Sequence, residues 1–224
     1  MAQVLKLHNC NVPSRVMAYP SSQAAPTKIL GDVSYAQVAE KYSALSSQDG
    51  FNAASTGSLE YTEDLRALVP ESVFGTSCGG GNPFAVGKPA SGQSVVDLGC
   101  GAGVDLCVAA ALVGAGGRVL GLDANEDMLS RAQHNVQLSS ADGRADVEFL
   151  HAPFDNPTNP ALTPYLSQFD VVISNGALCL SFDKPKALQT AFSLLRPGGF
   201  FQLFDLCVED GTVPESLGRW TQNS

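Results

Sequence analysis

Three glycines and two aspartates form the pattern in this sequence that says most about chemistry. Gly99, Gly101 and Gly103 directly follow a short apolar run. Glycines let the backbone turn sharply and approach a ligand closely, and the N–H groups of a following helix face that ligand. Asp123 ends the next apolar run about 20 residues later, where a carboxylate can accept hydrogen bonds from both hydroxyls of a ribose. This spacing predicts a site for a nucleoside-containing cofactor.

The second aspartate, Asp97, separates two classes of such cofactors. A dinucleotide site would have the spacing Gly-x-Gly-x-x-Gly, whereas the glycines here occur at every second position. The carboxylate of Asp97 would repel a pyrophosphate, but it suits the cationic amino-acid end of S-adenosylmethionine. A dinucleotide site and a glycine-rich turn that binds no ligand are the two alternatives.

The elements that must position these residues alternate between apolar strands and helices. We predict strands at residues 94–98, 118–122, 147–150, 169–174 and 200–206. The last helix is expected to stop at the Arg-Pro-Gly-Gly turn of residues 196–199, before the fifth strand. Apolar strands that alternate with helices are typical of a parallel sheet covered on both faces. The sequence therefore predicts an α/β, Rossmann-like fold with a parallel sheet of about five strands.

Four segments follow from the same patterns. Residues 1–32 contain three prolines and no sustained period, so we expect an irregular N-terminal arm. Residues 33–90 contain two amphipathic patterns and form a helical N-terminal extension. Residues 91–208 form the Rossmann-like core, and residues 209–224 form a polar C-terminal tail.

Composition and charge exclude several classes of protein. Of the 224 residues, 44% are hydrophobic and 16% are charged, which predicts a globular domain with a sizeable core. The 13 basic residues are outnumbered by 22 acidic ones and lie scattered, so we expect no nucleic-acid partner. No apolar run approaches the roughly 20 residues of a membrane span, and the N-terminus lacks an apolar signal region. We therefore expect a cytoplasmic protein with no membrane partner.

The other chemistry-bearing residues form no recognised site. The six cysteines include no Cys-x-x-Cys pair, and no His, Cys or carboxylate pair has the spacing of metal ligands. No Gly-x-Ser-x-Gly nucleophile motif occurs either. We therefore expect no metal site, and free thiols in a reducing compartment.

Six motifs between about residue 61 and residue 205 are shared with a known family. They are Gly-Asn-Pro at 81–83, Val-Asp-Leu-Gly-Cys-Gly-Ala-Gly-Val-Asp at 96–105, Gly-Leu-Asp at 121–123, Ser-Asn at 174–175, Leu-Ser-Phe-Asp-Lys at 180–184 and Leu-Arg-Pro-Gly-Gly at 195–199. In these motifs the chain resembles the class I S-adenosylmethionine-dependent methyltransferases, and most of all the arsenite methyltransferase family. The resemblance implies that residues 33–90 cover the cofactor.

The resemblance also implies a set of site residues. Those expected to bind the cofactor are Asn82, Asp97, Gly99, Cys100, Gly101, Gly103, Asp123, Ala124, Met128 and Asn175. Within this set, Asp97 and the first two glycines would hold the methionine portion, Asp123 the ribose and Ala124 the adenine. Asn175 would lie beside the transferring methyl group and is also a candidate catalytic residue. Because a sulfonium is already a strong electrophile, catalysis would consist mainly of positioning.

Cysteines that hold trivalent arsenic in the family are absent at two matching positions. Gly80 and Gly176 stand where the family has cysteine, and a third family cysteine lies beyond the fifth strand, in a region that we do not find in this chain. Cys78 and Cys179 lie close to the two replaced positions in sequence. They are candidate catalytic residues as a displaced thiol pair, because thiolates suit a thiophilic centre. The alternative is that both are ordinary buried cysteines.

Taken together, the resemblance implies an S-adenosylmethionine-dependent methyltransferase that acts on a small soft nucleophile, either trivalent arsenic or a thiol. The alternative is a catalytically silent relative that binds the cofactor, or a protein partner through an open sheet edge. The C-terminal hairpin of the family's sheet is expected to be missing, since only a polar tail follows the fifth strand. We expect the arm, the tail or a second copy in a homodimer to cover that edge. Candidate covering residues are Val16, Met17, Tyr19 and Trp220.

Overall fold

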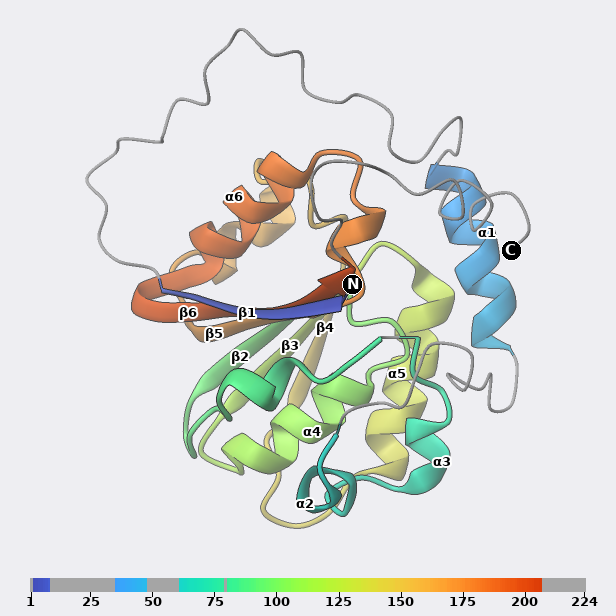
Figure 1. Ribbon diagram of the computed structural model, residues 1–224, viewed down its shortest axis with the longest axis vertical. Helices are drawn as coiled ribbons and strands as arrows, with labels where there is room; N and C mark the ends of the chain where they lie inside the picture. The colour runs from blue at the N-terminus through green and yellow to red at the C-terminus, as the bar shows by residue number, and fades with distance from the viewer. Residues whose placement is uncertain (1, 9–34, 48–60, 79, 207–224) are drawn as a thin grey trace, which may run out of the picture.

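One six-stranded sheet organises the molecule (Figure 1). The computed structural model describes residues 2–8, 35–47, 61–78 and 80–206. The strands are β1 (Ala2–His8), β2 (Ser94–Leu98), β3 (Arg118–Asp123), β4 (Val147–His151), β5 (Phe169–Asn175) and β6 (Leu195–Leu206). Their order is β1-β6-β5-β2-β3-β4; β2 to β6 are parallel, and β1 is antiparallel to β6. The predicted α/β fold with five parallel strands is confirmed.

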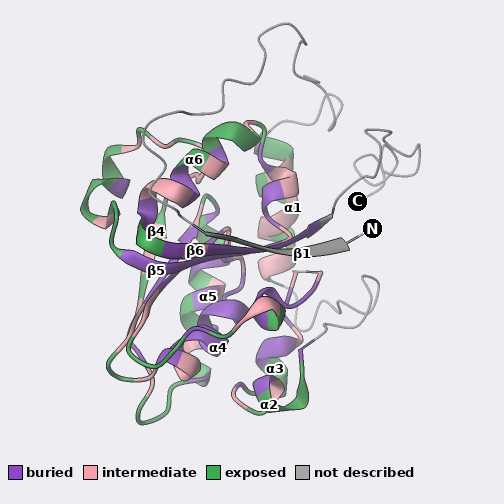
Figure 2. Ribbon diagram, turned by 60° about the vertical axis from the view of Figure 1, so that its left-hand side comes forward, coloured by how far each residue is buried: buried purple, intermediate pink, exposed green. Residues whose placement is uncertain are grey.

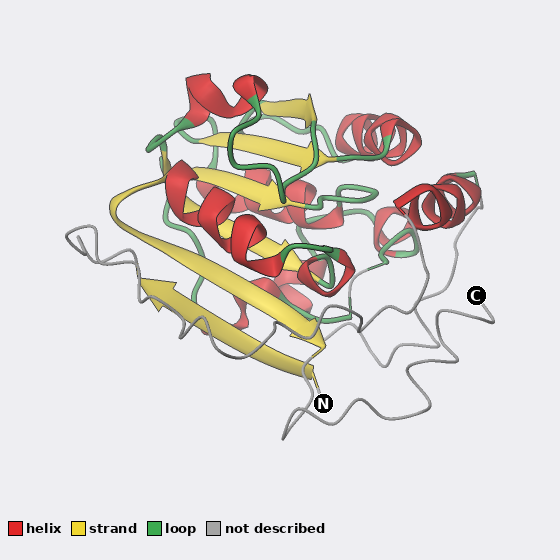
Figure 3. Cartoon of the chain, turned by 90° about the horizontal axis from the view of Figure 1, so that it is seen from above, coloured by secondary structure: helices red, strands yellow, loops and turns green. Residues whose placement is uncertain are grey.

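Helices cover both faces of this sheet (Figure 3). The helices are α1 (Tyr35–Ser46), α2 (Glu63–Arg66), α3 (Glu71–Phe74), η2 (Pro83–Val86), α4 (Val104–Val113), α5 (Glu126–Leu138), η3 (Pro160–Tyr165), η4 (Leu178–Leu180) and α6 (Lys184–Leu194). No helix in the described part of the chain is long and apolar enough for a membrane span.

The alternation of side chains along the strands divides the core into two layers. Val95 and Val119 pack on the face that carries α4 and α5, whereas Val96 and Leu120 pack on the face that carries α6. Successive residues of a strand point to opposite faces, so apolar residues are needed at every position. All seven residues of β5 are buried, and Figure 2 shows the central strands as the most buried part of the sheet.

The strand order places the candidate site. From β2, the chain continues to β3 on one side, and β5 and β6 lie on the other side. Ligands of open α/β sheets bind at such a reversal, outside the carboxyl ends of the strands. The glycine turn after β2, Asp123 at the end of β3 and Asn175 at the end of β5 all lie at this edge.

Two expectations about the ends of the sheet need correction. The arm was expected to be irregular, but residues 2–8 form β1, which pairs along the open edge of β6. The arm therefore covers the open edge of β6. It was one of three expected covers; the tail and a second copy were the other two. The covering residues suggested by the sequence, Val16, Met17, Tyr19 and Trp220, lie outside the described residues, as does the tail.

The second correction concerns the start of β6. The helix ends at Leu194 and the strand begins at Leu195, five residues earlier than predicted. Gly198 adopts a left-handed backbone with φ +83°, and the register with β5 shifts between Phe169 and Val171. The Arg-Pro-Gly-Gly segment is thus a bulge within the strand rather than a turn before it.

Candidate cofactor site

The glycine turn joins β2 to α4 and leaves its backbone open to a ligand. Gly99, Gly101 and Gly103 have φ values of +75°, +50° and +81°, which favour glycine. A Cβ atom on Gly99 would lie 2.4 Å from the Cβ of Ala177, and one on Gly103 would lie 2.8 Å from the Cβ of Ala132. A Cβ on Gly101 would meet no atom within 4 Å. The first and third glycines are therefore needed for packing, and the middle one borders open space.

Asp123 is held in a fixed position against this turn. Its Oδ2 accepts the backbone N–H of Gly101 at 2.8 Å, and its Oδ1 accepts the N–H of Asn125 at 2.9 Å. Burial raises the pKa of this carboxyl, whereas the backbone hydrogen bonds lower it. A third backbone hydrogen bond comes from Ala124. A carboxylate has about four lone pairs, so it keeps acceptor capacity for a ligand.

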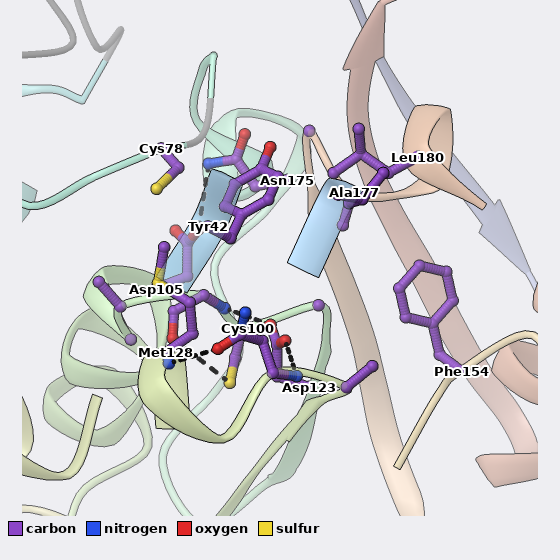
Figure 4. Close-up of a pocket in the computed structure, with 18 of the residues that line it drawn as sticks. Tyr42, Cys78, Cys100, Asp105, Asp123, Met128, Phe154, Asn175, Ala177 and Leu180 are labelled. Atoms are coloured by element: carbon purple, nitrogen blue, oxygen red, sulfur yellow. Dashed lines mark hydrogen bonds between the residues drawn. The ribbon is translucent and has the colours of Figure 1, made fainter. Parts of the chain in front are cut away.

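Most of the residues predicted to bind the cofactor surround one cavity (Figure 4). The cavity encloses about 1000 Å³, including space open to solvent, which is large enough for a nucleoside cofactor. The predicted residues that line it are Cys78, Gly99, Cys100, Gly101, Gly103, Asp123, Ala124, Met128 and Asn175. Asp97, Asn82 and Cys179 do not line it.

Asp97 and Asn82 lie behind the cavity wall. Asp97 is 2% exposed within β2, and its Oδ1 has no hydrogen-bond partner. Burial, with the negative charges of Asp105 and Asp123, raises the pKa of the Asp97 carboxyl well above its usual range. Asn82 is also buried, and its Oδ1 accepts the N–H of Phe84 at 2.9 Å as the N-cap of η2. Both residues can support the site without touching a ligand in this cavity.

The two candidate thiols have different surroundings. Cys78 lines the cavity, and burial, reinforced by Asp123, raises its pKa to about 12. Cys179 is turned toward the Gly176 carbonyl, with its Sγ 3.3 Å from that oxygen. Burial and the negative charge of Asp205 raise the pKa of Cys179 as well. Both thiols therefore remain protonated at neutral pH.

A buried polar network that sequence reasoning missed lies beside Asn175. The Asn175 Nδ2 donates to the Gly81 carbonyl at 2.8 Å and to Asp105 Oδ2 at 3.0 Å. The Tyr61 hydroxyl donates to the other oxygen of Asp105. Burial raises the pKa of Asp105 to about 6, and the hydrogen bonds from Tyr61 and Asn175 hold it from rising further. Asp105 is the last residue of the glycine motif in the sequence. Tyr61 lies 44 residues earlier and contacts Asp105 only in the folded protein.

A wall of the cavity comes from outside the sheet. Val38, Ala39 and Tyr42 of α1 line it, and Asn125 joins this helix to the start of α5. Its Nδ2 donates to the Ala39 carbonyl at 2.9 Å and to Ser43 Oγ at 3.1 Å. The segment 33–90, which was expected to cover the cofactor, thus contributes α1 to the wall of the cavity.

The charge of the cavity restricts its ligands. Among the described residues, the side chains that line it include three carboxylates, Asp105, Asp123 and Asp155, but no lysine, arginine or histidine. A pyrophosphate would have no cationic partner here, whereas an adenosine with a positively charged amino-acid end fits the lining. Within the described residues, no three His, Cys, Asp or Glu side chains are grouped as metal ligands would be.

A family model described as a methyltransferase domain matches residues 89–223, which is more than half of the chain. The chain belongs to this methyltransferase family. Its relatives include arsenite methyltransferases, one of them a solved arsenic(III) S-adenosylmethionine methyltransferase. The family therefore agrees with the nucleoside site predicted from the glycine turn and Asp123.

Two curated relatives of the methyltransferase domain are arsenite methyltransferases. The one from Halobacterium salinarum is 32% identical over 160 residues, which cover 69% of this chain and 37% of that protein. The one from Aquipseudomonas alcaligenes is 38% identical over 116 residues, which cover 51% of this chain and 33% of that protein. The chain thus spans about a third of the length of these relatives.

Solved structures place the methyltransferase domain in the same group. The arsenic(III) S-adenosylmethionine methyltransferase from Chlamydomonas reinhardtii matches with a TM-score of 0.57 and 33% identity, over 70% of this chain and 53% of that one. The phosphoethanolamine N-methyltransferase 2 of Haemonchus contortus, solved with S-adenosyl-L-methionine, matches with a TM-score of 0.52 over 72% of this chain and 37% of that one. At 24% identity, the second likeness supports the fold alone.

Proposed function

We propose that this methyltransferase domain binds S-adenosylmethionine across the glycine turn and transfers its methyl group to a small soft nucleophile, either a thiol or trivalent arsenic. The observation that carries this proposal is the Asp123 carboxylate, fixed by the Gly101 and Asn125 N–H groups at the cavity. A nucleoside site built in this way suits the cofactor of the family.

Each part of the cavity has a proposed role. Asp123 accepts the ribose hydroxyls, and Ala124 and Met128 border the adenine. The backbone of Gly99, Cys100, Gly101 and Gly103 approaches the methionine portion, where the first turn of α4 begins. Asn82 and Asp97 act from behind the wall, through the η2 cap and through charge.

The chemistry requires little more than alignment. When bound, the cofactor supplies a methyl group that is already activated by its sulfonium. Asn175 is fixed by Gly81 and Asp105, so its amide can border the reacting centre without moving. Tyr42 and the rest of α1 exclude water from the cavity and hold the acceptor and donor together.

The proposed acceptor is limited by the two thiols. Arsenic binds cysteine as thiolate, so thiols with raised pKa values bind it only with release of their protons. Of these two thiols, Cys78 lines the cavity and Cys179 does not. We therefore expect Cys78→Ser to lower arsenite methylation more than Cys179→Ser. If neither substitution changes the rate, the displaced-thiol interpretation is wrong.

The cofactor proposal is tested by calorimetric binding of S-adenosylmethionine to the purified chain. We expect micromolar affinity, and a loss of about 10- to 100-fold in Asp123→Ala, because two ribose hydrogen bonds to a charged group disappear. Asp142→Ala removes an equal charge from an exposed turn away from the cavity, and its affinity should match the wild type.

The outcomes of this measurement separate the two candidate functions. Absence of binding in the wild type would overturn the cofactor proposal. Binding without methyl transfer to arsenite or to thiols would favour the silent relative, an alternative consistent with glycine at positions 80 and 176.

A further inference from the structure

Asp105 is a buried carboxylate at the cavity whose visible partners are all uncharged. It is 8% exposed and lies in the first turn of α4. Tyr61 donates to one of its oxygens and Asn175 to the other. Two neutral donors orient the carboxylate, but they do not neutralise its charge.

The other titratable groups that interact with Asp105 are acidic and provide no counter-charge. Asp97 on β2 interacts with it electrostatically, and so do the thiols of Cys100 in the glycine turn and Cys107 on α4. Asp123 interacts electrostatically with Asp97 and with Cys100, and Arg144 interacts electrostatically with Cys107. Within the part of the chain that the structure describes, no lysine, arginine or histidine lines the cavity. Burying an ionised carboxylate without a counter-charge is costly, so a cation from a ligand would stabilise this arrangement.

The position of Asp105 in the cavity determines which end of a bound nucleoside cofactor it contacts. Figure 4 shows Asp105 close to Asn175, with Asp123 at a separate point along the cavity. The glycine turn contacts both carboxylates' positions: its Gly101 N–H donates to Asp123, and its last glycine, Gly103, is the N-cap of α4, whose first turn carries Asp105. A nucleoside at Asp123 therefore directs the opposite end of the molecule across the turn toward Asp105.

We propose that Asp105 binds the ammonium group of the cofactor's methionine end, and that Tyr61 and Asn175 position its carboxylate for this contact. This inference rests on the proposed cofactor site at Asp123. The sequence suggested Asp97 for the ammonium contact. The proposal assigns this contact to Asp105 instead, because Asp105 lines the cavity and Asp97 does not. Asp97 then contributes through charge from behind the wall.

The test compares two nucleosides that differ only beyond the sulfur. S-adenosylhomocysteine carries the amino-acid end, whereas 5′-methylthioadenosine has the same adenosine and a thioether but no ammonium. Affinities for both are measured by calorimetry at pH 7.5 for the wild type, Asp105→Asn and Asp123→Ala. Asparagine has nearly the same shape as aspartate and can still accept the Tyr61 hydrogen bond, but its NH2 group loses the hydrogen bond from Asn175. The affinity for methylthioadenosine therefore serves as the check that Asp105→Asn keeps the site intact.

We expect Asp105→Asn to weaken S-adenosylhomocysteine by about 10- to 100-fold, the size of a charge-assisted hydrogen bond, and to change methylthioadenosine by less than about twofold. Asp123→Ala should weaken both ligands. Equal effects of Asp105→Asn on the two ligands, or no effect on either, would overturn the assignment. If the wild type binds neither ligand, the underlying cofactor site fails instead, which is a different result.

The pH dependence provides a second readout that a purely structural role would not change. An ammonium binds the ionised carboxylate, so wild-type affinity for S-adenosylhomocysteine should fall below pH 6, by up to tenfold per unit. The ligand's ammonium stays protonated between pH 5 and 7. Tyr61→Phe removes a hydrogen bond that lowers the pKa of Asp105, so the decrease should begin at a higher pH. A decrease that persists unchanged in Asp105→Asn would contradict the proposal.

Discussion

Gly101 and Gly103 share a left-handed backbone but have different surroundings, which allows binding to be separated from packing. We expect Gly101→Ala to cost about 1–2 kcal/mol of unfolding free energy, from backbone strain alone. Its methyl group would enter the space next to Asp123, so cofactor affinity should fall at least tenfold. Gly103→Ala adds a clash with Ala132 and should cost about 3 kcal/mol.

Urea unfolding and calorimetry of the two glycine variants check this prediction. The expected pattern is a nearly stable Gly101→Ala that binds poorly and a less stable Gly103→Ala. If both variants lose similar unfolding free energy and bind the cofactor with equal affinity, the open space at Gly101 is not part of the ligand site.

At the level of single residues, the sequence predicts some site positions and not others. Asp123 could be predicted, because it ends a strand at the edge of the sheet where ligands bind. The choice between Asp97 and Asp105 could not, because it depends on which side chain faces the cavity. The Tyr61 contact with Asp105 joins residues 44 positions apart, and no local pattern encodes it.

Among the elements, α5 and α1 are joined through one side chain with two functions. The Asn125 Oδ1 accepts the N–H groups of Asp127 and Met128, both at 3.0 Å, as the N-cap of α5. Its Nδ2 donates to α1. Asn125→Asp keeps the acceptor for the cap, but loses the donor and places a negative charge against the Ala39 carbonyl.

We therefore predict that Asn125→Asp unfolds close to the wild-type temperature, while the amides of α1 exchange at least severalfold faster. Asn125→Ala loses the cap as well and should cost about 1 kcal/mol. Hydrogen exchange of residues 36–46, read by mass spectrometry, is the measurement. Wild-type exchange of α1 in Asn125→Asp would show that this contact does not hold the helix.

Elements with a strong local pattern were predicted close to their true bounds. The strands β2 to β5 lie within one residue of the predicted ranges. For β2, β3 and β5 the reason is a nearly continuous apolar run typical of buried parallel strands, whereas the edge strand β4 is only partly buried. β1 was not predicted, because seven residues beside a proline-rich segment carry too little periodicity, and the strand is defined by its partner β6. The bulge at Gly198 was read as a turn because both use a left-handed glycine.

For the whole molecule, the buried carboxylates predict how stability depends on pH. A carboxyl with a raised pKa holds its proton more tightly when folded, so its contribution is present below the unfolded pKa and is lost as the pH rises. For Asp105 this loss runs from pH 3.8 to about 6, and amounts to about 3 kcal/mol. Without ligand, Asp105→Asn should therefore be more stable than the wild type at pH 7 and similar to it at pH 4.

Urea unfolding of both proteins at several pH values measures that difference directly. Using the difference between the two proteins removes the contribution of titrating groups that do not interact with Asp105, whereas Asp97, which does interact with it, remains part of the difference. A gap that does not widen between pH 4 and 7 would contradict the raised pKa. A charge that lowers the stability of the free protein is typical of a residue kept for function.

The antiparallel pairing of β1 with β6 has a consequence for synthesis on the ribosome. Ala2 pairs with Leu206, so the strand made first waits for a partner made about 200 residues later. At about 5–20 residues per second, this delay lasts roughly 10–40 seconds. During that time the nascent chain carries an unpaired strand that other chains can capture. Chaperones that shield β1 during this delay would therefore affect the yield of this protein more than its final stability.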